Sequence, residues 1–331
     1  MKILVTGGMG FIGSNFIRYM LSSHEDVGIV NLDNLSMGSN LANLKDVEGD
    51  PRYTFVKGSI TDFPLISKLI KGMDAVVNFA AETHVDRSIA DPRPFFESNT
   101  LGTFNLLEAC RNADVKFIHV STDEIYGDIV EGSFKEEDRL HPSNPYSASK
   151  AAADGFVLAY HRTYGLDTVV TRCTNNFGPY QYPEKLIPKT IIRASMGLKV
   201  PVYGSGRNVR DWIYVLDHCK ALDLVLQEGR PGEIYNISGG NEYENIEVVK
   251  KILKLTGKDE SLIEFVEDRP GHDVRYSLDS SKIRNELGWK PEHDFESALR
   301  ATVKWYSENG WWWRPIATEE VLHPTPWKLR W

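Results

Sequence analysis

Residues 6–13 read TGGMGFIG, and this stretch decides the fold class. It follows a short apolar run at residues 3–6, which predicts a buried strand, and it leads into a helical pattern. Gly8, Gly10 and Gly13 have the Gly-x-Gly-x-x-Gly spacing, which permits a tight turn and lets backbone N–H groups approach a pyrophosphate. Glycine turns are common, so the stretch indicates a dinucleotide site only because a strand precedes it and a helix follows it.

The same alternation of strand and helix continues through the first half of the chain. Further short apolar or β-branched runs predict strands at residues 27–33, 53–57, 75–80, 117–121 and 168–173, each with a candidate helix before the next. This rhythm is typical of an α/β fold. It predicts a Rossmann-type, doubly wound parallel sheet with helices on both faces.

After about Asn176 the rhythm changes. Helical patterns at 186–196, 217–227, 246–255 and 298–307 are separated by irregular stretches rich in Gly, Pro and Tyr. We expect residues 1–176 to form the dinucleotide-binding domain, with segments from about 207–240 completing its sheet. We expect residues 177–331 to form mainly a smaller, mixed α/β substrate domain.

The end of the second predicted strand selects between the two nicotinamide dinucleotides. Asp33 lies 20 residues after Gly13. A carboxylate there can accept hydrogen bonds from the adenosine ribose and would repel a 2′-phosphate. The sequence therefore favours NAD over NADP.

Two further motifs carry groups for chemistry. Tyr146 and Lys150 lie four residues apart at the start of a helical pattern, hence on one helix face, where a cation should lower the pKa of the phenol. Asp123 and Glu124 end the strand predicted at 117–121, in the stretch STDE. A redox reaction alone needs no such carboxylate pair, whereas elimination of water needs an acid and a base.

Composition excludes several classes of function. The formal net charge of −8 argues against a nucleic-acid partner, which usually requires a basic face. The three cysteines, an odd number, lie far apart without metal-type spacing, so we expect buried thiols in a reducing compartment and no metal site. The sequence shows no signal-peptide pattern and no apolar run long enough to cross a bilayer, so a cytoplasmic protein without a membrane partner is expected.

Taken together, these motifs resemble those of the extended short-chain dehydrogenase/reductases, and among them the dTDP-glucose 4,6-dehydratases of the NAD-dependent epimerase/dehydratase group. The resemblance covers nearly the whole chain. It includes AAETHVDRS at residues 80–88, NNFGPY at 175–180, PEKLIP at 183–188, NVRDW at 208–212 and DRPGH at 268–272. Several long motifs in the right order are far more specific than any one of them.

The resemblance implies a three-step cycle on a sugar nucleotide. Tyr146, with Lys150, takes the proton of the 4-hydroxyl, which Thr122 helps to hold, as hydride leaves carbon 4. Glu124 then removes the proton on carbon 5 while Asp123 protonates the departing 6-hydroxyl. Hydride finally returns to carbon 6. NAD is regenerated in such a cycle and should stay bound.

The resemblance also implies two binding sets. The cofactor-binding set is Gly7, Gly10, Phe11, Ile12, Gly13, Asp33, Asn34, Ser36, Ser59, Ile60, Phe79, Ala80, Ala81, Ser98, Tyr146, Lys150 and Asn176. The substrate-binding set is Thr83, His84, Thr122, Asn175, Lys185, Leu186, Pro201, Tyr203, Arg210, Asn245, Arg269 and His272.

The chain departs from the family pattern at two positions. Ser59 stands where an Asp that contacts the adenine is common, so one cofactor hydrogen bond is weakened or is made by the hydroxyl instead. Thr83 replaces a Ser and keeps the hydroxyl.

Several alternatives share part of the pattern. A nucleotide-sugar 4-epimerase would need the glycine loop, Tyr146 and Lys150, but not Asp123 and Glu124. GDP-mannose 4,6-dehydratases usually have Ser-Glu after the Thr and prefer NADP. A non-catalytic NAD-sensing protein would tend to lose one of the catalytic groups. A UDP-glucose 4,6-dehydratase stays open, because one methyl-sized group on the base is worth only ~1–3 kcal/mol.

Family members pair two long helices of each subunit into a four-helix interface. The corresponding patterns here, at residues 94–113 and 146–164, carry apolar residues on more than one face. We therefore expect a homodimer.

Overall fold

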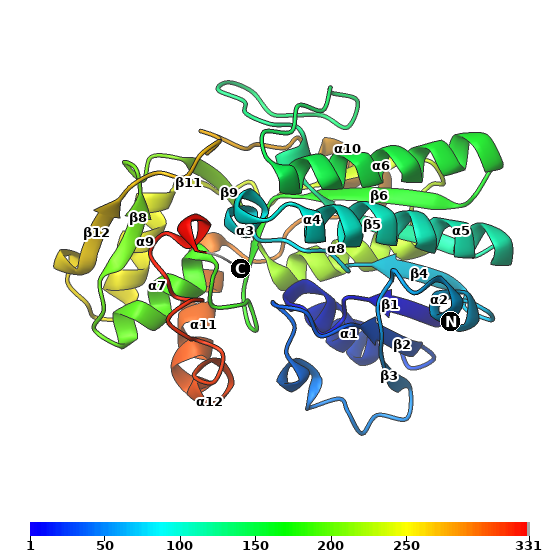
Figure 1. Ribbon diagram of the computed structural model, residues 1–331, viewed down its shortest axis with the longest axis horizontal. Helices are drawn as coiled ribbons and strands as arrows, with labels where there is room; N and C mark the ends of the chain where they lie inside the picture. Colours follow the sequence, from blue (N-terminus) through cyan, green and yellow to red (C-terminus); the bar gives the residue numbers. More distant parts are fainter. Residues whose placement is uncertain (330–331) are drawn as a thin grey trace.

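The computed structural model describes residues 1–329 of the chain, and the last two residues of the predicted second domain lie outside that range. Within residues 1–329, no helix is both long enough and apolar enough to cross a membrane. The ribbon divides into a larger lobe built on a parallel sheet and a smaller lobe beside the carboxyl ends of its strands (Figure 1).

The larger lobe confirms the predicted fold class. Its seven-stranded sheet has the order β10-β6-β5-β4-β1-β2-β3 within the described residues, and each neighbouring pair is parallel. The strands are β1 (Lys2–Thr6), β2 (Gly28–Asp33), β3 (Tyr53–Lys57), β4 (Ala75–Asn78), β5 (Lys116–Thr122), β6 (Thr168–Cys173) and β10 (Ile234–Ile237). The order reverses between β1 and β4, which is where ligands bind in sheets of this kind.

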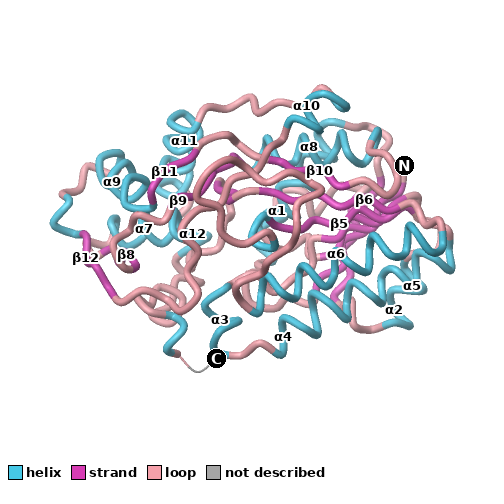
Figure 2. Tube along the Cα trace, turned by 90° about the horizontal axis from the view of Figure 1, so that it is seen from above, coloured by secondary structure: helices cyan, strands magenta, loops and turns pink. Residues whose placement is uncertain are grey.

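Helices cover both faces of the sheet, as its apolar strands require (Figure 2). One face packs on α1 (Phe11–Ser23), α8 (Val215–Glu228) and α10 (Ser281–Leu287). The other face packs on α2 (Phe63–Leu69), α5 (Thr103–Ala113) and α6 (Pro145–Tyr164). Successive side chains of β1 point to opposite faces of the sheet, so Ile3 and Val5 lie in the first core and Leu4 lies in the second.

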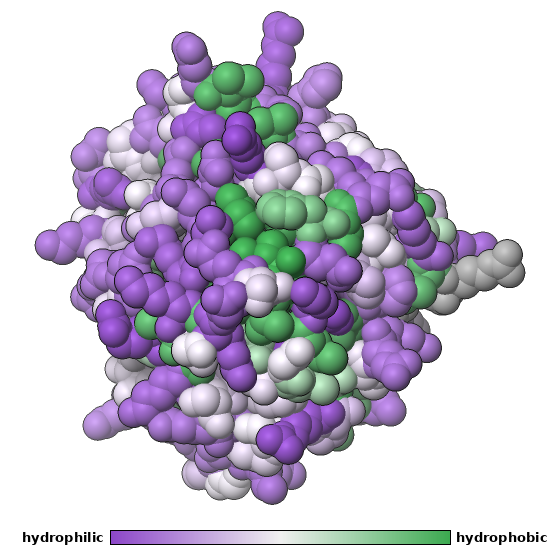
Figure 3. Space-filling model, turned by 90° about the vertical axis from the view of Figure 1, so that its left-hand side faces the viewer, coloured by the Kyte–Doolittle hydropathy of each residue, from purple (hydrophilic) through white to green (hydrophobic). Residues whose placement is uncertain are grey.

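The smaller lobe contains short strands and amphipathic helices. One sheet has the order β11-β9-β7, formed by β11 (Glu242–Glu244), β9 (Val209–Tyr214) and β7 (Asn175–Phe177), and β12 (Ile263–Val266) pairs with β8 (Val200–Tyr203). Helices α7 (Leu186–Ser195), α9 (Asn245–Leu255), α11 (Phe295–Glu308) and α12 (Gly310–Trp313) pack with them. On the end of this lobe, apolar side chains lie among polar ones (Figure 3).

Between β4 and β5 the structure differs from the single helix expected at 94–113. The chain forms α3 (Val85–Ala90), α4 (Arg93–Phe95), a π-helix η2 (Phe96–Gly102) and then α5. Side-chain bonds hold the wider π turn: Asn99 Nδ2 donates to the Glu82 carbonyl and to Ser149 Oγ, and Thr100 Oγ1 donates to the Ser149 carbonyl. Such contacts with residues distant in the chain leave no periodic pattern in the sequence. The remaining elements are short 3-10 helices: η1 (Leu41–Leu44), η3 (Asp123–Ile125), η4 (Glu260–Leu262) and η5 (Pro326–Lys328).

Candidate active site at the carboxyl edge of the sheet

A pocket follows the carboxyl ends of the parallel strands, from β3 across to β6, and we call it the edge pocket. All seventeen residues of the predicted cofactor set line this pocket, and so do the five predicted catalytic residues. Of the predicted substrate set it contains Thr83, Thr122, Asn175 and Lys185. The structure thus brings segments from many parts of the chain, between residues 7 and 185, to one cavity.

The glycine loop at the start of the pocket has room for backbone only. Gly7 has φ of +71°, and a Cβ built there would lie 2.6 Å from the Ala80 nitrogen. A Cβ on Gly13 would lie 2.5 Å from the Gly7 carbonyl oxygen. The missing side chains let the N-terminus of the thirteen-residue helix α1 face the pocket, which suits an anionic pyrophosphate.

Asp33 ends β2 at the far side of this loop. Its carboxylate accepts hydrogen bonds from the Met9 nitrogen at 2.9 Å, the Leu35 nitrogen at 2.7 Å and Ser39 Oγ at 3.0 Å. Burial raises its pKa, while these donors oppose the rise. The carboxylate is therefore fixed in the pocket wall and retains acceptor capacity for ribose hydroxyls, so the loop and Asp33 fit an NAD molecule.

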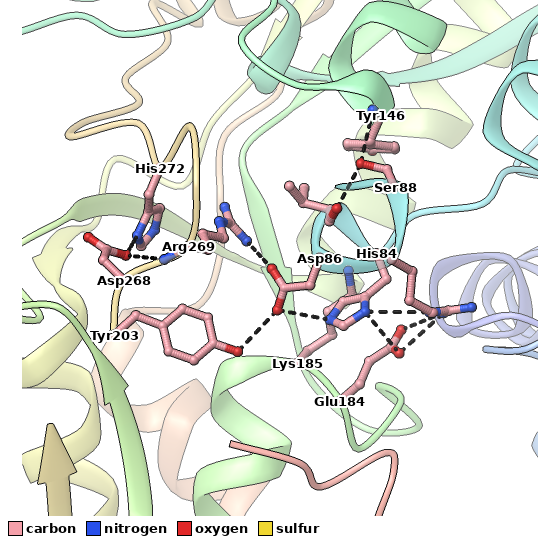
Figure 4. Close-up of polar contacts among 12 residues, drawn as sticks. His84, Asp86, Ser88, Tyr146, Glu184, Lys185, Tyr203, Asp268, Arg269 and His272 are labelled. Atoms are coloured by element: carbon pink, nitrogen blue, oxygen red, sulfur yellow. Dashed lines mark hydrogen bonds and ion pairs between the residues drawn. The ribbon is translucent and has the colours of Figure 1, made fainter. Parts of the chain in front are cut away.

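Helix α6 begins where it does because of its cap. Asn144 Oδ1 accepts from the Ser147 nitrogen, Ser147 Oγ accepts in return from the Asn144 nitrogen, and Pro145 occupies the first turn. Tyr146 and Lys150 then lie one turn apart on the buried face of the helix. The Tyr146 nitrogen also donates to Ser88 Oγ at 3.3 Å, which ties the helix start to α3 (Figure 4).

The pKa of the phenol differs from the sequence expectation. Burial, followed by the Glu124 charge, raises the pKa of Tyr146 well above its usual value, and a hydrogen bond with Thr122 acts in the opposite direction. The net direction is therefore opposite to the lowering expected from Lys150, because burial outweighs it. Lys150 Nζ donates instead to the Val120 carbonyl at 2.8 Å, and burial lowers the Lys150 pKa to about 8.

Asp123 and Glu124 both face the pocket because the chain leaves β5 through the turn η3. Thr122 caps this turn: its Oγ1 accepts from the Glu124 nitrogen at 3.3 Å and lies 3.2 Å from Asp123 Oδ1. On a continuing strand the two carboxylates would point to opposite faces. The turn removes that alternation and puts both beside Tyr146.

The surroundings of the two carboxyls differ in charge. Burial and the neighbouring Glu124 raise the pKa of Asp123 well above its usual value. Burial also raises the pKa of Glu124, but Arg269, Lys185 and Arg210 act against that rise. Two carboxyls whose environments differ in this way suit one acid and one base.

The cations near Glu124 are held by a buried network that joins the lobes. Asp86, from α3, accepts from Arg269 Nη1 at 3.0 Å and from Tyr203 Oη at 3.1 Å, both of which belong to the smaller lobe (Figure 4). Asp86 is 2% exposed. His84 Nε2 lies 3.8 Å from the same carboxylate.

A second part of this network positions Lys185. Glu184 pairs with Arg87 at 3.0 Å and lies 3.4 Å from His84 Nδ1. Lys185 Nζ donates to the Thr83 carbonyl at 2.9 Å, so the lysine reaches across to the larger lobe. Burial lowers the pKa of Lys185, and the nearby carboxylates counter that effect.

The other predicted substrate residues lie outside the lining of the edge pocket. His84, Tyr203 and Arg269 meet around Asp86, while Leu186 opens α7 and Pro201 lies on β8. Arg210 lies over the Tyr276 ring at 4.2 Å and donates to the Asp273 carbonyl, Asn245 opens α9, and His272 contacts Asp268 at 2.6 Å.

The structure adds lining residues that the sequence motifs missed. Gln181 and Tyr182 line the pocket between two motifs that were recognised, and Glu184 lines it from within one of them; Asp86, outside the lining, also lies within a recognised motif. Their position in or beside those motifs indicates that this region belongs to the site, but it does not indicate what each residue does there. Further lining residues that were not predicted are Leu32, Met37, Gly38, Ser39, Gly58, Val120, Ser121, Cys173 and Thr174.

Several buried polar atoms of the pocket lining lack partners. Among residues 1–329, Ser121 Oγ, Asp123 Oδ2, Glu124 Oε2, Asn175 Oδ1 and Gln181 Oε1 have no hydrogen-bond partner, and in the smaller lobe neither do Asn245 Oδ1 and Arg269 Nε. Buried polar atoms are almost always paired. Their concentration here indicates a site for a polar ligand that carries both hydroxyl and anionic groups.

Known proteins share this architecture. The family model described as GDP-mannose 4,6 dehydratase matches residues 4–302. A dTDP-glucose 4,6-dehydratase of Streptomyces niveus is 50% identical over 98% of this chain and 98% of its own. A solved dTDP-glucose 4,6-dehydratase of Streptomyces venezuelae, with NAD and TYD bound, has a TM-score of 0.94 and is 50% identical, covering 96% of this chain and 100% of its own.

A solved UDP-glucose 4-epimerase of Thermotoga maritima is more distant. It is 30% identical, with a TM-score of 0.86, over 93% of this chain and 99% of its own. The shared fold therefore extends to epimerases, while the higher identity lies with dehydratases. The chain belongs to the family that the matching model describes and, within it, to the dTDP-glucose 4,6-dehydratases.

Proposed function

We propose that the chain converts dTDP-glucose into dTDP-4-keto-6-deoxyglucose and water, as a hydro-lyase. The observation that carries this proposal is the pair Asp123 and Glu124, one buried and one half-buried carboxyl in unlike electrostatic surroundings beside Tyr146. Hydroxide is a poor leaving group and needs an acid, and a carbon acid needs a base. Neither group is needed for epimerisation at carbon 4.

NAD supplies the hydride acceptor for carbon 4 and the hydride donor for carbon 6 when it is bound. The glycine loop would hold its pyrophosphate, and Asp33 its adenosine ribose. Ser59 would face the adenine, where its Oγ now contacts Thr61 Oγ1 at 2.8 Å. Lys150 and Tyr146 would meet the nicotinamide ribose. The residues Asn34, Ser36, Ile60, Phe79, Ala80, Ala81, Ser98 and Asn176 complete the proposed cofactor wall.

Tyr146 acts as the base for the 4-hydroxyl in this proposal, and Thr122 orients that hydroxyl. Burial raises the pKa of the phenol and so disfavours the phenolate, which is the form that accepts a proton. Tyr146 therefore needs a neighbouring positive charge to stabilise that phenolate. Lys150, one helical turn away, is the cation of this chain placed to supply it.

Glu124 and Asp123 carry out the elimination. Once carbon 4 is a ketone, the proton on carbon 5 becomes acidic, and Glu124 takes it. Asp123, whose raised pKa favours its protonated form, gives a proton to the 6-hydroxyl, so that water leaves. Each such contribution is typically worth ~10²–10⁴-fold in rate.

The smaller lobe binds the nucleotide end of the substrate. The cations Lys185, Arg210 and Arg269 suit the diphosphate. Pro201 and Tyr203, together on β8, would flank the base. The remaining proposed contacts are Thr83, His84, Asn175, Leu186, Asn245 and His272.

Mass spectrometry tests the activity. The purified protein is incubated separately with dTDP-glucose and with UDP-glucose, without added NAD. Loss of one water from dTDP-glucose supports the proposal, and a faster reaction of UDP-glucose would reassign the base. An unchanged mass, with added NAD as control, would remove the dehydratase activity. A galactose isomer at constant mass would instead show an epimerase.

We also propose a homodimer built on α5 and α6. Apolar side chains stay exposed along this side: Phe96 is 60% exposed, Leu101 41%, Phe156 40% and Tyr164 54%. Pairing with a second copy would cover them. Light scattering at micromolar concentration should give twice the chain mass, and a monomeric mass would contradict the proposal. A cytoplasmic location remains a prediction, which cell fractionation can check.

A further inference from the structure

Behind Lys150 lies a row of buried ionisable groups that the proposed reaction does not use. Asp154 follows Lys150 by one turn of α6, His119 comes from β5 and Arg172 from β6. His119 and Asp154 are 0% exposed, Arg172 2% and Lys150 3%. Buried charges of this kind are costly unless they compensate one another.

The contacts form a continuous chain. Lys150 Nζ lies 3.4 Å from His119 Nε2, and His119 Nε2 lies 3.6 Å from Asp154 Oδ1. The other carboxylate oxygen, Asp154 Oδ2, accepts from Arg172 Nε at 3.0 Å. Arg172 therefore fixes one oxygen, while Oδ1 has no hydrogen-bond partner in the part of the chain described.

His119 is a neutral spacer in this chain. Burial, with Lys150 and Arg172 nearby, lowers its pKa well below the usual value. Asn78 Nδ2 donates to His119 Nδ1 at 3.2 Å, while Asn78 Oδ1 accepts from Thr6 Oγ1 at 2.6 Å. With the amide in that orientation, the ring proton sits on Nε2 and faces Asp154 Oδ1, so the approach of Lys150 Nζ to Nε2 is a contact and not a hydrogen bond.

Asp154 is the source of negative charge beside Lys150. The ionisable groups that face Lys150 are Tyr146 and Asp154 on its own helix, His119 on β5, and Arg172 and Cys173 on β6. Burial raises the pKa of Cys173 to about 12 and that of Tyr146 well above its usual value, so both are neutral at pH 7. Asp154, paired with the Arg172 guanidinium, is the charge that most strongly opposes the effect of burial on Lys150.

We propose that Asp154 is a positioning residue for the reaction: its carboxylate, anchored by Arg172, keeps Lys150 protonated across the His119 ring. The proposal rests on the proposed function, because Tyr146 acts as a base only beside a cation. Asp154 touches neither the edge pocket nor any group that would meet the substrate.

The first test is the pH profile of kcat/KM for Asp154→Asn, with dTDP-glucose as substrate. The isosteric amide removes the charge and keeps the shape. The alkaline limb, where Lys150 loses its proton, should move to lower pH by about one unit, since an opposite charge at such range shifts a pKa by ~1–3 units. The KM at pH 6.5 should stay unchanged, because Asp154 makes no contact in the pocket.

Two comparisons separate charge from structure. Asp154→Glu restores the charge and should return the limb toward its original position. Asp167→Asn removes the same charge from a partly exposed carboxylate 4.0 Å from Lys116, and it should leave the limb in place. If Asp154→Asn leaves Arg172 without a counter-charge and so fails to fold, the double variant Asp154→Asn/Arg172→Gln removes both charges. The alkaline limb of this double variant should still lie at lower pH than that of the wild type.

A second measurement does not depend on turnover. The protein is labelled with ¹³C at the lysine ε-carbon, and the Lys150 resonance is identified by its loss in Lys150→Arg. Its titration midpoint should fall by about one pH unit in Asp154→Asn. An unmoved midpoint, or an unmoved alkaline limb in the folded variant, overturns the proposal. If the wild-type protein leaves dTDP-glucose unchanged, the proposed function fails, and the resonance still decides the role of Asp154.

Discussion

Replacing Asp123 with Asn separates the two halves of the elimination. The amide has the size of the acid and can keep the contact with Thr122, which lies 3.2 Å from the carboxyl. It cannot deliver a proton to the leaving hydroxyl. Glu124 should keep its function, because burial and the cations Arg269, Lys185 and Arg210 are the main influences on its pKa, and the substitution leaves them in place.

The size of the effect follows from the charge state. Burial and Glu124 raise the pKa of Asp123, which favours the protonated form that a general acid needs. Losing a general acid slows a reaction by ~10²–10⁴-fold. That range corresponds to ~3–5 kcal/mol in the barrier. Formation of dTDP-4-keto-6-deoxyglucose should fall by this factor.

Deuterium exchange measures the half that remains. In D₂O the variant should still oxidise carbon 4 reversibly and exchange the proton on carbon 5, so that recovered dTDP-glucose gains one mass unit. Glu124→Gln should lose both the exchange and the product. Turnover of Asp123→Asn within ~10-fold of wild type would refute the acid assignment, since a general acid contributes at least ~10². Loss of exchange in Asp123→Asn would show that removal of the carbon 5 proton also depends on Asp123, and so that the acid and base roles are not separate.

Three further outcomes follow from the structure. Asp86→Asn removes the buried carboxylate that faces the partly buried Arg269 and should lower the free energy of unfolding in urea by ~3 kcal/mol, whereas an unchanged midpoint would show that the pair is dispensable. Gly13→Ala puts a Cβ 2.5 Å from a carbonyl oxygen and should weaken NAD binding in calorimetry, while Gly155→Ala, which meets nothing within 4 Å, should not. Burial lowers the pKa of His218 to about 3, so the stability gained from its neutral ring is complete above pH 6.5 and is lost as pH falls toward that value. His218→Gln should therefore flatten the dependence of unfolding free energy on pH between 6.5 and 4, by up to ~3 kcal/mol, and an unchanged slope would contradict this assignment.

Much of the larger lobe could be predicted from local patterns. Buried parallel strands are continuous apolar runs, and the glycine loop and Asp33 are tied to the ends of the first two of them, so their meeting follows from strand order alone. Tyr146 and Lys150 share a helix face by spacing. Such features depend on residues close in sequence or on the rule that parallel strands end at one edge.

What escaped prediction depends on contacts between distant residues. Asp86 and Arg269 lie 183 positions apart, and nothing in either motif shows that one compensates the other. The direction of the Tyr146 pKa also escaped, because spacing places Lys150 near it but cannot show that Nζ turns to the Val120 carbonyl. Burial then outweighs the expected effect of the lysine. Individual pKa values depend on this packing and not on the motif.

The π-helix η2 fixes how α5 is rotated about its axis relative to the residues that precede it. Its residues Phe96–Gly102 join α4 to α5 without a break, so that Ser98 lines the edge pocket while Leu106 and Leu107 point into the core. Removing one residue from this segment would turn everything on one side of it by about 100° relative to the other. Either Ser98 would leave the pocket or the buried face of α5 would rotate into water. Substitutions here should thus be tolerated far better than single deletions, and the length of this segment carries information that its composition does not.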